Sequence, residues 1–131
     1  MMKNIQAQMK ELFGNSCYAY CIAAISILPE GRTLKRLTKA VLDYWLMGYI
    51  DDDGYVSKPV ECMNIHKAYS VYKDVKHVPY VPSPKEQIVC WEYNGGTHFV
   101  IMKDDKVIFD PAGDSNTVKY GKIKNARLFV K

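Results

Sequence analysis

The first half of the chain places its apolar residues at the three- and four-residue spacing of amphipathic helices. A short helix is predicted over residues 4–13, and an almost wholly apolar helix follows over 17–28. A third helix over 33–48 carries a wide apolar stripe, and a fourth is predicted over 59–70. Because a helix that is apolar on every side must be surrounded by protein, the 17–28 helix is expected at the centre of the domain.

In the second half the pattern changes to short runs of strand-forming residues separated by turns. Three prolines (Pro79, Pro82 and Pro84) first impose an extended connection. Strands are then predicted, in a meander of antiparallel pairs, over 87–93, 98–103, 106–110, 118–120 and 127–130. Helices followed by strands indicate an α+β fold in which N-terminal helices pack on a C-terminal antiparallel sheet. Residues 1–131 contain no repeat or linker and are expected to form a single domain.

Composition excludes several classes of protein. A hydrophobic fraction of 48% is too high for a disordered chain. No stretch approaches the ~20 apolar residues of a membrane span, and no secretory signal is visible, so a cytoplasmic protein without an integral membrane segment is expected. The net charge of +4 is mild, and no nucleic-acid motif accompanies it. The basic residues are therefore predicted to be solvated, on one helix face (Arg32, Lys35, Arg36, Lys39) and in the tail (Lys119, Lys122, Lys124, Arg127, Lys131).

One of the four cysteines has the sequence context of a nucleophile. Cys17 opens the apolar helix directly after Asn15 and Ser16, which are both typical helix N-caps. A thiol there experiences the positive end of the helix dipole, which favours the reactive thiolate. The free N–H groups of the first turn could also bind an oxyanion. Taken alone, Cys17 could also be a small buried residue, so its role depends on a base nearby.

A base and a carboxylate that orients it are predicted on one β-hairpin. Among the three histidines, His98 opens an apolar strand next to a turn, where its ring would be held rigidly at a cleft. If the hairpin loop is Lys103-Asp104-Asp105, His98 faces Asp110 directly, with Cβ atoms about 5 Å apart. This register requires a three-residue loop with Asp105 in a left-handed or bulged conformation. A two-residue loop would place the two side chains on opposite faces.

Three segments together resemble the papain-like cysteine peptidases. They are Asn15-Ser16-Cys17 at the start of an apolar helix, Gly96-Thr97-His98-Phe99-Val100 on a strand, and Phe109-Asp110-Pro111 beyond a hairpin. The most similar branch is that of the bacteriocin-processing, double-glycine-leader peptidases and their small phage and bacterial relatives. The resemblance implies a papain-like fold without a cofactor, in which Cys17 is the nucleophile, His98 the base and Asp110 the residue that orients the base.

The chain departs from this family at one position. The superfamily often places a Gln six residues before the cysteine as an oxyanion donor, but Glu11 stands there in this sequence. The candidate oxyanion donors are therefore Asn15, whose amide could substitute, and Gln8, which lies three residues too early for the family spacing.

The expected activity is hydrolysis of a peptide or isopeptide bond through an acyl-enzyme. A phage lysin-like hydrolase of peptidoglycan would use the same triad, so the substrate is either a peptide or a peptidoglycan-type chain. An alternative is a catalytically inactive module that binds a peptide along its aromatic residues (Trp45, Trp91, Tyr93). A further alternative is a Cys₃His zinc domain, with ligands drawn from the 17–28 helix and the fourth helix (Cys17, Cys21, Cys62, His66).

Overall fold

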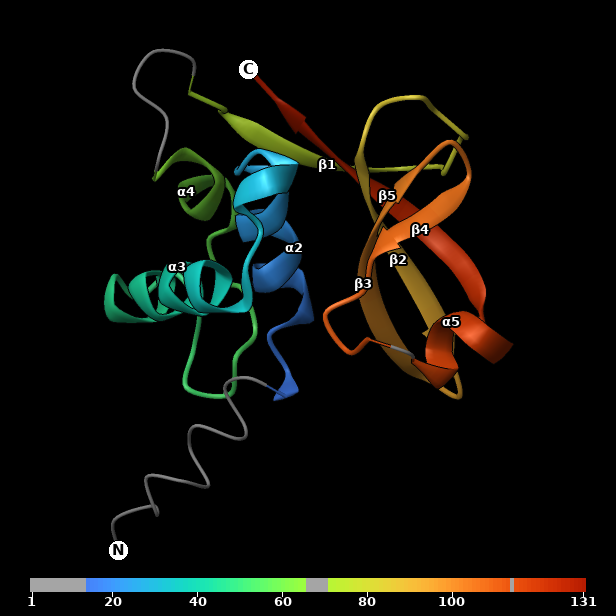
Figure 1. Cartoon of the computed structure of the whole chain (residues 1–131), viewed down its shortest axis with the longest axis horizontal. Coiled ribbons are helices and arrows are strands. Elements are labelled where there is room, and N and C mark those ends of the chain that lie inside the picture. The colour runs from blue at the N-terminus through green and yellow to red at the C-terminus, as the bar shows by residue number, and fades with distance from the viewer. Residues whose placement is uncertain (1–13, 66–70, 114) are drawn as a thin grey trace, which may run out of the picture.

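A computed structural model of the protein describes residues 14–65, 71–113 and 115–131. With the labels of Figure 1, its helices are α2 (Cys17–Ile25), α3 (Leu34–Leu46), α4 (Pro59–Asn64) and α5 (Asn116–Tyr120), with a short 3₁₀ turn at Pro29–Gly31. Its strands are β1 (Asp74–Val78), β2 (Gln87–Tyr93), β3 (Gly96–Lys103), β4 (Lys106–Phe109) and β5 (Lys122–Val130). In the described part of the chain, helices precede a sheet whose strand pairs are all antiparallel, which confirms the predicted α+β class.

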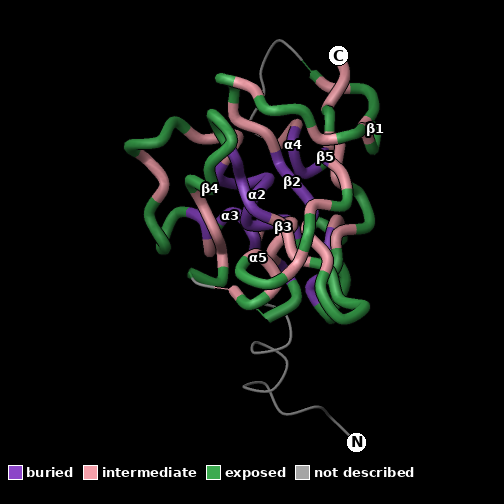
Figure 2. Tube along the Cα trace, turned by 90° about the vertical axis from the view of Figure 1, so that its right-hand side faces the viewer, coloured by how far each residue is buried: buried purple, intermediate pink, exposed green. Residues whose placement is uncertain are grey.

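The sheet has the strand order β1-β5-β2-β3-β4. Strands β2, β3 and β4 therefore form the predicted meander, whereas β5 returns to pair with the other side of β2. Helices α2, α3 and α4 lie on one side of the sheet and α5 on the other (Figure 1). The most buried segments are α2 and the central strands, between these layers (Figure 2). Among the described residues, no helix combines the length and apolar character needed to cross a bilayer.

Helix α2 is the centre of the larger apolar core, as its pattern predicted. Its middle residues, from Ala19 to Ala24, are all buried, and it packs against α3, α4 and the sheet. The helix ends at Ile25, earlier than predicted, and Ser26 closes it by donating from its hydroxyl to the carbonyl of Ala23 at 2.8 Å. Such close packing fixes the position of the first turn of α2 relative to β3.

The second half of the chain contains two departures from the prediction. Residues 118–120, predicted as a strand, belong to α5, because the Ser115 hydroxyl accepts from the N–H of Val118 at 3.4 Å and begins a helix there. Strand β1 was not predicted: among the described residues it is a polar strand at the edge of the sheet, paired with β5, and it has no apolar alternation. The predicted helix over 4–13 and the end of the predicted fourth helix lie outside the described residues.

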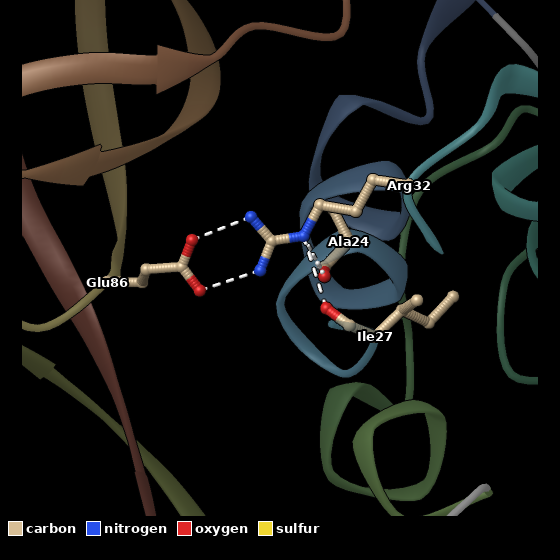
Figure 3. A network of polar contacts seen from close by, with 4 residues as sticks. All are labelled: Ala24, Ile27, Arg32 and Glu86. Carbon is tan, nitrogen blue, oxygen red and sulfur yellow. Dashed lines mark hydrogen bonds and ion pairs between the residues drawn. The ribbon is translucent and has the colours of Figure 1, made fainter. Parts of the chain in front are cut away.

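Arg32 ties the helical layer to the sheet (Figure 3). Its two terminal nitrogens each donate to one carboxylate oxygen of Glu86 at 2.6 Å, and its Nε donates to the carbonyls of Ala24 and Ile27 at 2.7 and 3.2 Å. The side chains are only 10% and 23% exposed. The prediction that Arg32 is solvated on a helix face is therefore wrong, because Arg32 precedes α3 and its planar fork matches a carboxylate geometrically.

Candidate active site

The first turn of α2 presents the Cys17 thiol at the boundary between the helical layer and the sheet. Ser16 occupies the N-cap position, but its side chain makes no capping hydrogen bond. Helices α3 and α5, in contrast, are capped by the side chains of Thr33 and Ser115. The N–H groups that open α2 are therefore not occupied by the capping side chain, and they lie next to a sulfur atom.

The remaining cysteines lie in different surroundings. Cys17 is half-buried, whereas Cys21, Cys62 and Cys90 are at most 1% exposed and all are free thiols. Burial raises the pKa of Cys21 well above its usual range, that of Cys62 to about 12, and that of Cys90 as well. Because the thiolate is the reactive species, these three buried thiols are chemically inert at neutral pH.

His98 and Asp110 form a short, buried hydrogen bond. The Nε2 atom of His98, on β3, lies 2.6 Å from Oδ1 of Asp110, which directly follows β4, and the two side chains are 12% and 9% exposed. The same Oδ1 accepts from the backbone N–H of Ala112 at 2.9 Å, while Oδ2 accepts from the Ser115 hydroxyl at 3.1 Å. Three donors from three places thus fix the plane of the Asp110 carboxylate.

The hairpin register that brings these residues together differs from the prediction. Asp104 and Asp105 both have positive φ, 52° and 61°, and form a two-residue turn between Lys103 and Lys106, not the three-residue loop expected. The ladder then shifts, so that Met102 pairs with Val107 but Ile101 pairs with Phe109. The shorter turn alone would put His98 and Asp110 on opposite faces of the sheet, and the extra residue in β4 returns them to the same face. Asp110 therefore lies diagonal to His98, where direct opposition was predicted.

Two pockets meet at the Cys17–His98 pair. One, of about 480 Å³, lies toward α3 and the loop after β4, and its walls are mostly apolar (Tyr20, Leu34, Leu37, Phe109, Pro111). The other, of about 440 Å³, lies toward the β2–β3 turn and is lined by Asn15, by three aromatic side chains (Tyr18, Tyr55, Phe99) and by Gly95 and Gly96, among others. Both include Gly14, Cys17 and His98. In Figure 1 the start of α2 faces the loop between β4 and α5 across this site.

Comparison with known proteins identifies the family but gives it no activity. A family model described as a protein of unknown function, DUF261, matches residues 1–131. The chain is a member of the DUF261 family. A search of the curated proteins found no match. A search of the solved structures found none either.

In this DUF261 protein, the electrostatics of the site centre on His98. Burial by itself would lower the pKa of the ring, but hydrogen bonds with Cys17 and Asp110, together with the charges of those two groups, outweigh burial and raise the pKa from 6.5 to about 9. Since Nε2 is bonded to Asp110, the other ring nitrogen, Nδ1, is left for the thiol. A protonated imidazole that faces a sulfur on one side and a carboxylate on the other can stabilise a thiolate and later donate a proton.

The other predicted site residues of the DUF261 chain lie in different places. Asn15 is exposed and lines the pocket toward the β2–β3 turn, whereas Gln8 and Glu11 lie outside the described residues. The aromatic residues proposed for a peptide groove do not line the two pockets at Cys17: Trp45 donates to Asp52 on the surface, Trp91 packs on the α5 side of the sheet, and Tyr93 lines a separate pocket. The aromatic residues that line the two pockets at Cys17 are Tyr18, Tyr20, Tyr55, Phe99 and Phe109.

No zinc site is visible in the part of the DUF261 chain that the structure describes. Within residues 14–65, 71–113 and 115–131, no group of three or more His, Cys, Asp or Glu side chains is arranged to hold a metal ion. His66, the fourth ligand of the zinc alternative, lies outside these ranges.

Sequence reasoning missed two residues that shape the site. Ser115 contacts Asp110, and Arg32 lines the apolar pocket next to Cys17 while holding Glu86. The run Asp110-Pro111-Ala112-Gly113, with Ser115 two positions further on, carries the signal for the first, because an aspartate that bonds the backbone two residues later is typical of a turn before a capped helix. The sequence carries no comparable local signal for Arg32, whose partner is 54 positions away.

Proposed function

We propose that this protein is a thiol-dependent hydrolase that cleaves an amide bond, with Cys17 as nucleophile, His98 as base and Asp110 as the residue that orients the base. The observation that carries the proposal is the position of the His98 ring, which is hydrogen-bonded to the carboxylate of Asp110 at 2.6 Å and lines, together with Cys17, both pockets of the site. This is the order of groups that covalent catalysis by a thiol requires. The papain-like resemblance of the three sequence segments supports the same assignment.

The proposed reaction follows from these positions. The Cys17 thiolate, paired with protonated His98, attacks the amide carbonyl and forms a C–S bond, and the resulting oxyanion is stabilised by N–H groups at the start of α2. The tetrahedral species collapses, the C–N bond breaks, and His98 donates its proton to the departing amine. Neutral His98 then takes a proton from water, whose oxygen attacks the thioester and releases the acid. Cys17 leaves as thiolate beside protonated His98, so the starting state is restored.

The shape of the site favours a chain-like substrate. The pockets extend from both sides of the Cys17–His98 pair, which suits a substrate that continues beyond the scissile bond in both directions. The charged side chains that line them are already neutralised, since Arg32 is paired with Glu86 and Asp110 with His98. A free α-amino or α-carboxyl terminus therefore finds no unpaired charge among these lining residues, which favours cleavage within a peptide over removal of a terminal residue.

Iodoacetamide labelling at pH 6, followed by mass spectrometry, tests the nucleophile. The wild-type protein should be alkylated once, at Cys17, because the other three thiols are buried. Cys17→Ala should abolish labelling without unfolding the protein, and His98→Ala should slow it. Cys90→Ala, which makes the same change at a buried thiol, should label like wild type. Equal labelling of Cys17→Ala and wild type would refute the assignment.

Hydrolysis is tested separately with a library of N-acetylated, C-amidated peptides and with purified peptidoglycan, each read by mass spectrometry. Cleavage that is lost in Cys17→Ala supports a hydrolase, and the substrate that is cut distinguishes a peptidase from a lysin-like enzyme. Specific labelling of Cys17 without cleavage of either substrate would instead favour a peptide-binding module that has lost its chemistry.

A further inference from the structure

Asp110 has a second, unassigned partner at the start of α5. The Ser115 hydroxyl donates to Asp110 Oδ2 at 3.1 Å, and the Ser115 hydroxyl oxygen accepts from the N–H of Val118 at 3.4 Å. Ser115 thus joins the capping of a short helix to the carboxylate that holds His98. The two oxygens of Asp110 have separate donors, since Oδ1 faces the His98 ring and the N–H of Ala112.

From this geometry we infer that Ser115 is a positioning residue: its hydroxyl sets the rotation of the Asp110 carboxylate so that Oδ1 points at Nε2 of His98. The inference rests on the proposed function for its consequence, because a misdirected Asp110 would leave the His98 ring free to turn away from Cys17. The terminal torsion of an aspartate is broad, so a donor on Oδ2 in addition to those on Oδ1 narrows the rotation of the Asp110 carboxylate. Asp110 lies one residue beyond the end of β4, so the strand ladder does not hold it.

In the described part of the chain, Ser115 is the side chain that donates to Oδ2 of the Asp110 carboxylate and so orients the carboxylate. The charged or titratable groups that act on the ring are Cys17, from α2, and Asp110 itself. Ala112 contributes only a backbone N–H, which no side-chain substitution short of proline removes. Losing a hydrogen bond to a charged group should have a roughly ten-fold or larger effect on a rate that depends on the ring being in place.

The test compares Ser115→Ala with Ser115→Thr. Alanine removes the donor and the helix cap, whereas threonine keeps both. Asn116→Gly serves as the matched control, because this exposed residue belongs to the same helix and its replacement weakens α5 without removing the hydroxyl. Two quantities are measured in each variant: the midpoint of the His98 ring titration by NMR, and the rate of Cys17 alkylation by iodoacetamide as a function of pH.

Ser115→Ala should lower the His98 titration midpoint toward its ordinary value and slow Cys17 alkylation at pH 6 about ten-fold. Ser115→Thr should restore both, and Asn116→Gly should change neither. A His98 midpoint in Ser115→Ala that equals or exceeds that of wild type would overturn the inference, as would an equal drop in Asn116→Gly. The NMR measurement needs no substrate, so a failure to find any hydrolysis would count against the proposed function alone and leave the role of Ser115 decided.

Discussion

Replacing Glu86 with Gln removes the charge that Arg32 grips while leaving the size of the side chain almost unchanged. In the wild type both terminal nitrogens of Arg32 donate to Glu86 at 2.6 Å, and the side chains are 10% and 23% exposed. Removing one partner of a fully buried ion pair costs about 3–5 kcal/mol, whereas exposed pairs contribute about 0–1 kcal/mol. Because water reaches part of Glu86, we expect Glu86→Gln to lower the free energy of unfolding by about 2 kcal/mol.

Arg32→Met should cost more, about 3 kcal/mol, because it also removes the Nε hydrogen bonds to the carbonyls of Ala24 and Ile27 at the end of α2. Urea unfolding followed by circular dichroism measures both losses, and for a chain of 131 residues a loss of 2 kcal/mol lowers Tm by about 7 °C. Asp43→Asn is the matched control, since the Lys39–Asp43 pair is 3.7 Å long with side chains 81% and 36% exposed, and its loss should cost less than about 0.5 kcal/mol.

The loss of stability at acidic pH gives an independent test of the Arg32–Glu86 ion pair. Hydrogen bonding to Arg32 lowers the pKa of Glu86 below 4.5. A group whose pKa is lowered by folding contributes stability above its unfolded pKa, and this contribution is lost as the pH falls through the folded pKa. Wild type should therefore lose more stability than Glu86→Gln between about pH 5 and pH 3. If Glu86→Gln is no less stable than Asp43→Asn at neutral pH, the ion pair does not hold the two layers together and the reasoning fails.

Three further predictions concern other parts of the molecule. Folding raises the pKa of His98 to about 9, so the stability that protonated His98 contributes is full below pH 6.5 and is lost as the pH rises through 9. NMR titration of the ring should show this midpoint. Hydrolysis should fall over the same pH range, because the departing amine loses its proton donor. Gly121→Ala should lower the free energy of unfolding, measured in urea, by about 3 kcal/mol, since an added Cβ would collide with two backbone carbonyl oxygens. Gly96→Ala is the control: the atom nearest to its added Cβ is 3.5 Å away, so the loss should be under about 1 kcal/mol. Tyr80→Phe should cost about 1 kcal/mol by losing the 2.6 Å hydrogen bond to Asp105, and an unchanged melt would show that this contact does not anchor the proline-rich segment.

The elements that the sequence predicted correctly are those whose burial imposes a pattern. Helix α2 is apolar all round because it is enclosed, and β2 lies over the residues expected because both of its neighbours are strands. Strand β1 lies at the edge of the described sheet and its polar residues meet solvent, so burial leaves no periodicity to detect. Helix α5 is too short for a period to develop, and its β-branched residues Thr117 and Val118 favour a strand locally. There the Ser115 cap outweighs the local propensity.

Whether His98 and Asp110 lie on the same face of the sheet depends on the number of residues in the turn and the bulge between them more than on any one strand pairing. The right-handed twist of the strands favours a two-residue turn with both residues left-handed, and Asp104 and Asp105 adopt it. Such a turn alone would separate the two side chains, but the ladder shift leaves Ile108 without a paired partner and returns them to one face. Bulges have a weaker sequence signature than turns, so the sequence identified the correct pair of residues through an incorrect loop. Because the pair is diagonal, the carboxylate of Asp110 must reach along the sheet to His98. A side chain that reaches in this way needs its own supports, and the donors from Ala112 and Ser115 supply them.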